Sequence, residues 1–288
     1  MNTKLIIIIG VLSSSLSSPL GRLSDAPSTV LVFYRMLFTI LITVPLTVRK
    51  NKEELMSISK KNLLLSLLSG VILGVHFIVY FTAVKYTSIS SCTTFATMEA
   101  FFVAFALVFI FKEKVSTKSW LGIVVTFIGA CLIAAADFNS GSNRIKGDAL
   151  AVLACVLVSS YTVIGRYVRK SGVSTNTYTC IVYVAAMITV ALSALVTCEQ
   201  IYPVSGRTLL CSLGLTVFCT LLGHSVFSWG LKYVQASYIS NAKMMSPAFA
   251  TVWGVLFFHE VPGVLSVIGI ITVIAGVLYY SNNLTVEK

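Results

Sequence analysis

The chain has 288 residues, of which 57% are hydrophobic and 11% are charged, and its formal net charge is +11. Soluble domains carry about a quarter charged residues, so this composition excludes a soluble globular protein. Apolar stretches of roughly twenty residues, the length of a helix that crosses a bilayer, recur along the sequence. We therefore expect a polytopic membrane protein whose partner is the lipid bilayer, with no soluble domain and no nucleic-acid partner.

Ten candidate spans follow one another along the chain. They cover residues 4–22, 28–48, 63–84, 89–111, 118–137, 147–166, 176–197, 208–231, 237–258 and 264–281. The first follows a Lys and superficially resembles a signal peptide, but it has no clear small-x-small cleavage site and aligns with a later span. We interpret it as a retained helix. The sequence therefore predicts an all-α integral membrane protein with ten transmembrane helices.

The basic residues predict the orientation of these spans. If the N-terminus is cytoplasmic, most Lys and Arg residues fall in inside segments, the longest being RKNKEELMSISKK after the second span. The outside segments hold only Arg22, Lys85, Arg144, Lys146 and Arg207. An excess of Lys and Arg marks the cytoplasmic side. We expect a multi-pass protein of the cell membrane with both termini in the cytoplasm.

Polar residues and glycines interrupt the first three spans. Serines from Ser13 to Ser18 suit either close helix packing or the wall of a wet cavity. Arg35 in the second span is expected to snorkel to the interface or to pair with a neighbouring helix rather than to contact a substrate. Gly70-x-x-x-Gly74 in the third span is a pattern of close helix packing.

Two histidines lie at nearly equivalent places in the third and eighth spans. His76 is followed by Tyr80 on the same helix face, and His224 is followed by Trp229. A single membrane His is usually hydrogen-bonded to a neighbour. Two at matching places, each near aromatic residues, are equally consistent with side chains that face a cavity.

Residues 85–129 and residues 232–276 form an internal sequence repeat. The two stretches align at a constant offset of 147 without a gap, and both contain Lys-Tyr, Phe-x-Glu and two glycines at matching positions. Such matches at one offset are not a hydrophobicity effect. A repeat of five helices is odd in number, so the second copy enters the membrane from the other side. We expect two inverted repeats, residues 3–137 and 146–281, as in many secondary carriers.

Residues shared by the two copies are interpreted as scaffold. Gly122, Gly129, Gly269 and Gly276 have heptad spacing and predict helix packing faces. Glu113 and Glu260 close the fourth and ninth spans, where capping or tying down the next loop is the favoured interpretation. The seven cysteines include no CxxC motif and are interpreted as small buried residues, so neither a metal site nor a cofactor is expected.

Several phrases of the sequence resemble the drug/metabolite transporter superfamily, specifically ten-helix permeases with two EamA-type repeats. They are FYRMLF, HFIVYFTAVKYTSIS, MEAFFVAFALVFIFKE, LGHSVFSWGLKYVQASYIS and KMMSPAFATVWGVLFFHE. The resemblance implies a central cavity lined by helices 1, 3, 4, 6, 8 and 9, and transport of small organic metabolites, often export of amino acids or related compounds. The second half keeps the family's mid-helix Ser246-Pro247, whereas the first half has Glu99-Ala100. The missing proline should leave the fourth span straighter than the ninth.

The charges that differ between the copies predict the recognition site. Glu99 and Lys243 are costly in lipid, so both should face protein or water. We hypothesise that they lie across one polar cavity and pair in the empty carrier, and that an amino acid zwitterion or a carboxylated metabolite competes for them. Glu99 could carry a coupling proton. The alternative is a permanent structural ion pair. His76, Tyr80, Tyr161, His224, Trp229 and Asn241 complete the candidate substrate-binding residues.

Other classes of function are less consistent with the sequence. The chain has no HExxH, GxSxG or metal-ligand spacing, so we do not expect an enzyme, and it has no GxxxxGK[ST] motif for ATP. A channel-like facilitator of small solutes is the main alternative to a carrier by alternating access, and an intramembrane enzyme is a more distant one. Substrate, direction, coupling ion and the choice between monomer and homodimer do not follow from the sequence.

Overall fold

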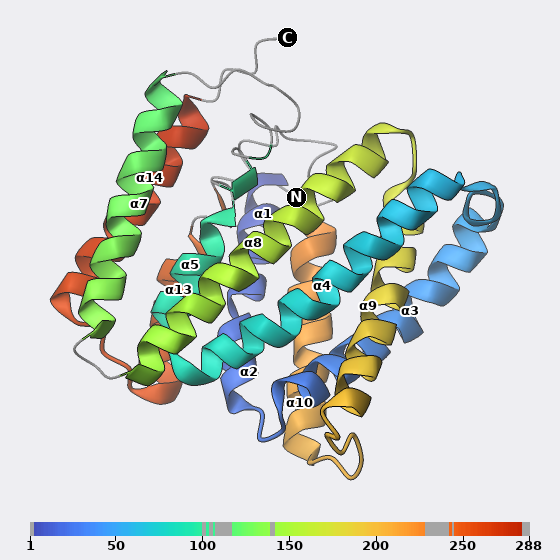
Figure 1. Ribbon diagram of the computed structural model, residues 1–288, viewed down its shortest axis with the longest axis horizontal. Helices are drawn as coiled ribbons and strands as arrows, with labels where there is room; N and C mark the ends of the chain where they lie inside the picture. Colours follow the sequence, from blue (N-terminus) through green and yellow to red (C-terminus); the bar gives the residue numbers. More distant parts are fainter. Residues whose placement is uncertain are drawn as a thin grey trace.

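The computed structural model describes residues 3–99, 102–103, 106, 117–138, 142–227, 242–243 and 245–283, and the secondary structure in these ranges is helical. The helices are α1 (Thr3–Ser15), α2 (Ser17–Leu23), α3 (Ser28–Ser57), α4 (Lys60–Tyr86), α5 (Ile89–Thr97), α7 (Thr117–Phe138), α8 (Ser142–Lys170), α9 (Thr175–Val196), α10 (Gly206–Gly214), the π-helix η1 (Leu215–Ser225), α13 (Ser246–Phe258) and α14 (Val264–Asn282). Each of the ten expected spans contains helix in this part of the chain (Figure 1).

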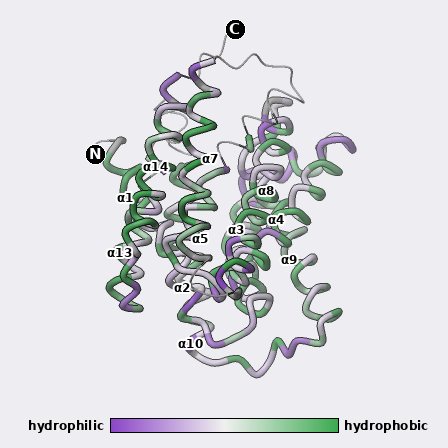
Figure 2. The backbone as a smooth tube through the Cα atoms, turned by 60° about the vertical axis from the view of Figure 1, so that its left-hand side comes forward, coloured by the Kyte–Doolittle hydropathy of each residue, from purple (hydrophilic) through white to green (hydrophobic). Residues whose placement is uncertain are grey.

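The lengths and surfaces of the helices suit a bilayer. Six described segments are long and apolar enough to cross a membrane: Leu5–Leu23, Ser28–Ser57, Lys60–Tyr86, Arg144–Arg169, Thr175–Val196 and Gly206–Gly223. The remaining apolar helices are shorter in the described part. Figure 2 shows long hydrophobic stretches within the helices and hydrophilic residues mostly near helix ends and connections. Large apolar side chains such as Leu64 and Leu195 are exposed on the outer surface, where lipid would cover them.

Helix packing follows the sequence duplication. The contact of α4 with α8 is matched by that of η1 with α1, and the contact of α5 with α8 is matched by that of α13 with α1. In addition, α3 meets α9, α5 meets α13 and α7 meets α14. Each of these last three pairs joins a helix to its counterpart in the other repeat. Such self-paired contacts are what a two-fold relation between two halves produces.

The heptad glycines lie where α7 and α14 pack side by side (Figure 1). A Cβ atom on Gly122 would lie 2.8 Å from the carbonyl oxygen of Gly276, and one on Gly129 would lie 2.9 Å from that of Gly269. Gly122 thus faces the counterpart of Gly129, and Gly129 faces the counterpart of Gly122, as in antiparallel helices related by a two-fold axis. The predicted packing faces are confirmed.

Gly70 and Gly74 bring α4 close to α9. A Cβ atom on Gly70 would lie 2.5 Å from the carbonyl oxygen of Val182, and one on Gly74 would lie 3.0 Å from that of Ala186. Only a residue without a side chain permits such an approach of two helices. The close packing predicted from the Gly-x-x-x-Gly pattern is therefore confirmed.

The fourth span is interrupted near its centre although it has no proline. α5 ends at Thr97, and the Met98 N–H donates to the Phe95 carbonyl at 3.1 Å. The hydroxyls of Thr93, Thr94 and Thr97 donate to carbonyls of the same helix, and such bonds compete with the backbone and bend helices. α13 begins directly after Met245, the counterpart of Met98. The expected difference in straightness between the fourth and ninth spans stays a prediction, because most residues after Glu99 and before Ala242 lie outside the described part of the chain.

Candidate functional site

The two ionisable residues expected at mid-span, Glu99 and Lys243, lie together. The distance from Lys243 Nζ to Glu99 Oε2 is 3.9 Å. Glu99 follows the interruption at Met98 in the first repeat, and Lys243 lies just before α13 in the second. The breaks at these two equivalent places bring one charge from each repeat to the junction between α5 and α13. The expected pairing of the two residues is confirmed.

α8 holds the Glu99 segment in position. Thr162 Oγ1 donates to Glu99 Oε1 at 2.6 Å, and Ser159 Oγ donates to the Glu99 backbone carbonyl at 3.3 Å. One carboxylate oxygen is therefore fixed by a hydroxyl, whereas the other faces Lys243. The threonine bond restricts the rotation of the carboxylate and so points its free oxygen towards the second repeat.

Lys243 is held more loosely than Glu99. Its ammonium lies 5.5 Å from the centroid of the Phe227 ring, within the range of a cation–π interaction. The separation of 3.9 Å from Glu99 exceeds the length of a charge-assisted hydrogen bond, about 2.7–2.9 Å. The Lys243 side chain is 36% exposed and that of Glu99 is 22% exposed. The two charges attract each other, yet each keeps bonding capacity for a third group.

His76 and Tyr80 are buried near this pair and have protein partners. His76 Nδ1 lies 2.7 Å from the Ala154 carbonyl oxygen, and the His76 ring stacks on the Tyr80 ring with centroids 5.9 Å apart. The Tyr80 hydroxyl lies 2.7 Å from Ser18 Oγ. These contacts join α4 to α8 and to α2. Both side chains therefore contribute to helix packing in this conformation, which is the structural alternative considered for His76.

Tyr161 is part of the interface between α8 and α9. Its ring stacks on that of Tyr178 with centroids 6.3 Å apart. The side chains of the other three candidate residues lie outside the part of the chain that the structure describes. Trp229 and Asn241 lie outside the described residues, and for His224 only the backbone, within η1, is described. Their proposed contact with a substrate stays a prediction.

Arg35 does not snorkel, contrary to one of the two structural expectations. Its side chain is 2% exposed. The guanidinium lies 4.1 Å from the centroid of the Phe77 ring and 5.8 Å from that of Phe81, and Nη2 donates to Thr220 Oγ1 at 3.3 Å. These partners lie on α4 and η1. Arg35 therefore pairs with neighbouring helices, which was the second of the two structural expectations. No carboxylate forms an ion pair with it among the described residues.

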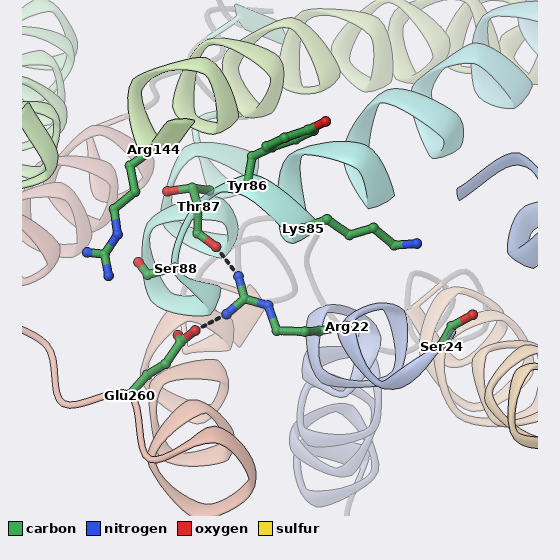
Figure 3. Close-up of a pocket in the computed structure, with 8 residues that line it drawn as sticks. All are labelled: Arg22, Ser24, Lys85, Tyr86, Thr87, Ser88, Arg144 and Glu260. Carbon is green, nitrogen blue, oxygen red and sulfur yellow. Dashed lines mark hydrogen bonds and ion pairs between the residues drawn. The ribbon is translucent and has the colours of Figure 1, made fainter. Parts of the chain in front are cut away.

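A second polar region lies where several helices end. Figure 3 shows Arg22 at the end of α2 pointing towards Glu260, which follows α13. The two side chains form an ion pair, and Glu260 Oε2 accepts from the Ile89 N–H at 3.0 Å at the start of α5. Glu260 was expected to cap a helix or tie down a loop, and it caps a helix of the other repeat. The link to Arg22 was not expected, because charge patterning places both residues on one side without pairing them.

The described residues contain no group of three or more His, Cys, Asp or Glu side chains that could hold a metal ion. The ionisable groups at the junction of the repeats are one acid and one base with hydroxyl and aromatic neighbours. Such an arrangement can bind complementary charges of a solute. Together with the two-fold packing of an apolar helical chain, this arrangement is typical of an internally duplicated membrane transporter.

The comparisons with known proteins agree with this class. The model of the EamA-like transporter family matches residues 2–135 and again residues 145–282, so the chain belongs to this family. An uncharacterized transporter of Clostridium kluyveri is 29% identical over 257 residues, which is 84% of this chain and 80% of the relative. The pseudopaline exporter CntI of Pseudomonas aeruginosa is 21% identical over 96% of this chain and 95% of its own length.

One solved structure shows the same fold. A crystal structure without a functional description matches with a TM-score of 0.65 at 16% sequence identity, covering 96% of this chain and 95% of its own. At this identity the likeness concerns the fold alone. The family match shows that the protein is a multi-pass membrane transporter and that it belongs to a transporter family rather than an enzyme family.

Proposed function

We propose that the protein is a secondary transporter that moves small organic metabolites, amino acids or related carboxylated compounds, by alternating access. The observation that carries this proposal is the loose ion pair of Glu99 and Lys243, with one charge from each repeat. In an inverted-repeat carrier the substrate binds where the repeats meet, so that movement of one repeat against the other changes the side from which the site is open.

The chemistry of the pair matches a zwitterion. The ammonium of an amino acid can take the place of Lys243 beside Glu99, and its carboxylate can take the place of Glu99 beside Lys243. Both protein charges then remain neutralised, which matters because an unpaired buried charge is strongly unfavourable. Such a ligand bridges the two repeats. Glu99 could also bind a proton that couples transport to a proton gradient.

Export is the proposed direction. A relative aligned over 96% of this chain is named a pseudopaline exporter, which supports export by this protein without identifying its substrate. The charge distribution supports cytoplasmic termini, with Arg22 and Glu260 at the outer end of the bundle. We take residues 3–137 and 146–281 as the two repeats of one carrier unit, which works as a monomer or within a homodimer.

Counterflow distinguishes this proposal from a channel-like facilitator. A thermal-shift screen of purified protein against amino acids, nucleosides and organic acids first identifies a ligand, because a compound that binds the folded state raises its apparent stability. Proteoliposomes are then loaded with an excess of that ligand, and uptake of the labelled compound is followed. A carrier accumulates label transiently against its gradient. Simple equilibration without an overshoot would assign the protein to the facilitators.

A further inference from the structure

A cavity of about 510 Å³ lies at the end of the bundle that carries Arg22 and Glu260 (Figure 3). Its lining includes three basic side chains, Arg22, Lys85 and Arg144, and one carboxylate, Glu260, together with hydroxyl groups. The lining comes from residues at or next to the ends of α2, α4, α5 and α8 and from Glu260 in the loop after α13. These correspond to spans 1, 3, 4, 6 and 9. We refer to this cavity as the Arg22 pocket.

The excess of positive charge in the Arg22 pocket suits an anionic ligand. A guanidinium and an ammonium both bind carboxylate or phosphate oxygens through charge-assisted hydrogen bonds. The Arg22 side chain is 20% exposed, which strengthens its electrostatic interactions relative to a fully solvated arginine. Figure 3 shows Lys85 and Arg144 on opposite sides of Arg22. The Lys85 side chain extends away from the Arg22 guanidinium and its ammonium donates to the Ala26 carbonyl, so Lys85 attracts an anion through its charge whereas Arg22 can contact it directly.

The Arg22 guanidinium is already held in a fixed orientation. Its Nε donates to the Val84 carbonyl at 2.9 Å, and Nη2 also donates to backbone carbonyls at the end of α4. The remaining nitrogen, Nη1, pairs with Glu260. Because the backbone positions the guanidinium independently of Glu260, removal of that carboxylate leaves a binding group that points in the same direction.

We propose that the Arg22 pocket is an anion-binding site, distinct from the Glu99–Lys243 pair, and that Glu260 occupies it as an internal competitor. The ligand class is a small soluble anion with carboxylate or phosphate groups. A solute anion that displaces Glu260 from Arg22 also separates a residue of the second repeat from the first. The role of this site in transport rests on the proposed carrier function, but anion binding itself does not.

Succinate binding to purified protein in phospholipid-free detergent tests the proposal. The thermal stabilisation by succinate is compared with that by sodium chloride of the same ionic strength, since salt alone screens charges. Glu260→Gln removes the competing charge and can still accept the Ile89 N–H. We expect it to bind succinate about fivefold more tightly than wild type, the factor expected for loss of a partly exposed ion pair. Adding Arg22→Gln to this variant should remove the gain.

Asp25→Asn is the matched control. It also removes one carboxylate at this end, but Asp25 pairs with Arg207 on the surface, where the side chains are 51% and 58% exposed, and neither residue lines the cavity. This variant should gain much less succinate affinity than Glu260→Gln, because Asp25 acts on Lys85 only from a distance and pairs with Arg207 rather than with Arg22. If Glu260→Gln binds no more tightly than Asp25→Asn, the proposal is wrong.

Further experiments test the proposal in other ways. If Glu260→Gln does not fold, Lys85→Gln is compared with wild type and should bind succinate more weakly. An unchanged affinity for succinate in Lys85→Gln would overturn the proposal. The Glu260→Gln gain should persist when Glu99→Gln and Lys243→Met are also present, which separates this site from the proposed substrate site. Loss of the succinate effect in phosphatidylglycerol nanodiscs would assign the pocket to lipid phosphate and contradict a soluble ligand.

Discussion

Lys243 Nζ lies 3.9 Å from Glu99 Oε2, and the two residues belong to opposite halves of a duplicated chain. Their counterparts in the other repeat are uncharged, since Glu99 matches Ser246 and Lys243 matches Ala96. The scaffold is thus symmetric at the packing helices and asymmetric at the charges. In the carrier that we propose, the symmetry lets the two halves exchange conformations, and the asymmetric pair gives a polar ligand one binding orientation.

Thr162 is expected to act as a positioning residue for Glu99. Thr162→Val removes the hydroxyl that donates to Glu99 Oε1 at 2.6 Å and keeps the side-chain shape. A single hydrogen bond of this kind to a charged group contributes about 1.5–3 kcal/mol. The substrate concentration that gives half-maximal transport should therefore rise by roughly tenfold or more. The maximal rate should change less than the half-saturation concentration.

Ser160→Ala is the control for this prediction, because Ser160 lies on the same helix and, within the part of the chain that the structure describes, donates to the Val156 carbonyl of that helix. Transport kinetics of the two variants are compared at equal amounts of folded protein. If Thr162→Val and Ser160→Ala have the same half-saturation concentration, Thr162 does not orient Glu99 for contact with the substrate.

The glycine contact between α7 and α14 should be sensitive to a single methyl group. A Cβ atom on Gly129 would lie 2.7 Å from the Val273 backbone nitrogen. Gly129→Ala therefore forces the helices apart and should destabilise the protein by about 1–3 kcal/mol. Thermal unfolding in detergent measures the effect. Gly206→Ala is the control, because no heavy atom lies within 4 Å of its added Cβ, and comparable loss in both variants would contradict the argument.

Arg35 should be replaceable without loss of stability. Its buried guanidinium has aromatic partners and one hydroxyl but no ion-paired carboxylate among the described residues, and its Nε has no hydrogen-bond partner. Replacing a buried charge by an apolar side chain of similar size is often neutral or stabilising. Arg35→Met should therefore unfold at or above the wild-type temperature, whereas Arg35→Lys, which brings a more strongly hydrated charge, should unfold lower. The reverse order would show that the positive charge of Arg35 stabilises the fold and would contradict this argument.

The orientation in the membrane can be tested with a native cysteine. Cys198 is exposed at the end of α9, in a segment expected outside the cell, whereas Cys131 is exposed within the apolar helix α7. A membrane-impermeant maleimide should label wild-type protein in intact cells, and Cys198→Ser should abolish that labelling. Cys131→Ser should leave it unchanged. Labelling of Cys198 only after permeabilisation would place both termini outside.

Much of the fold could be predicted because the bilayer imposes it. Helices must be about twenty apolar residues long to span the hydrocarbon core, so the spans and their alternation are visible in the sequence. The glycines at heptad spacing also predicted packing faces on the fifth and tenth spans, since close helix packing excludes larger side chains, and the structure shows that these two faces pack against each other. The meeting of Glu99 and Lys243 followed from the duplication, because the fourth and ninth spans are counterparts.

Other features depend on tertiary contacts that no local pattern records. The end of α5 at Thr97 has no proline to mark it in the sequence, and the hydroxyls of Thr93 and Thr97 donate to backbone carbonyls beside it. Arg35 was expected either to snorkel or to pair with a neighbouring helix, and its stacking on Phe77, which decides between the two, depends on the packing of α3 against α4. The ion pair of Arg22 and Glu260 joins residues from the two repeats. The charge pattern of the sequence predicted that both lie on the outer side of the membrane, but it could not predict that they contact each other.

The most direct test of the account is counterflow in proteoliposomes with variants of the central pair. Glu99→Gln and Lys243→Met each leave one partly buried charge without its partner and remove one of the two groups proposed to bind the substrate, which should lower counterflow by about tenfold to a hundredfold. Lys243→Arg, which keeps the charge, should retain more activity than Lys243→Met. Wild-type counterflow in folded Glu99→Gln and Lys243→Met would show that the pair does not bind the substrate and would contradict the account.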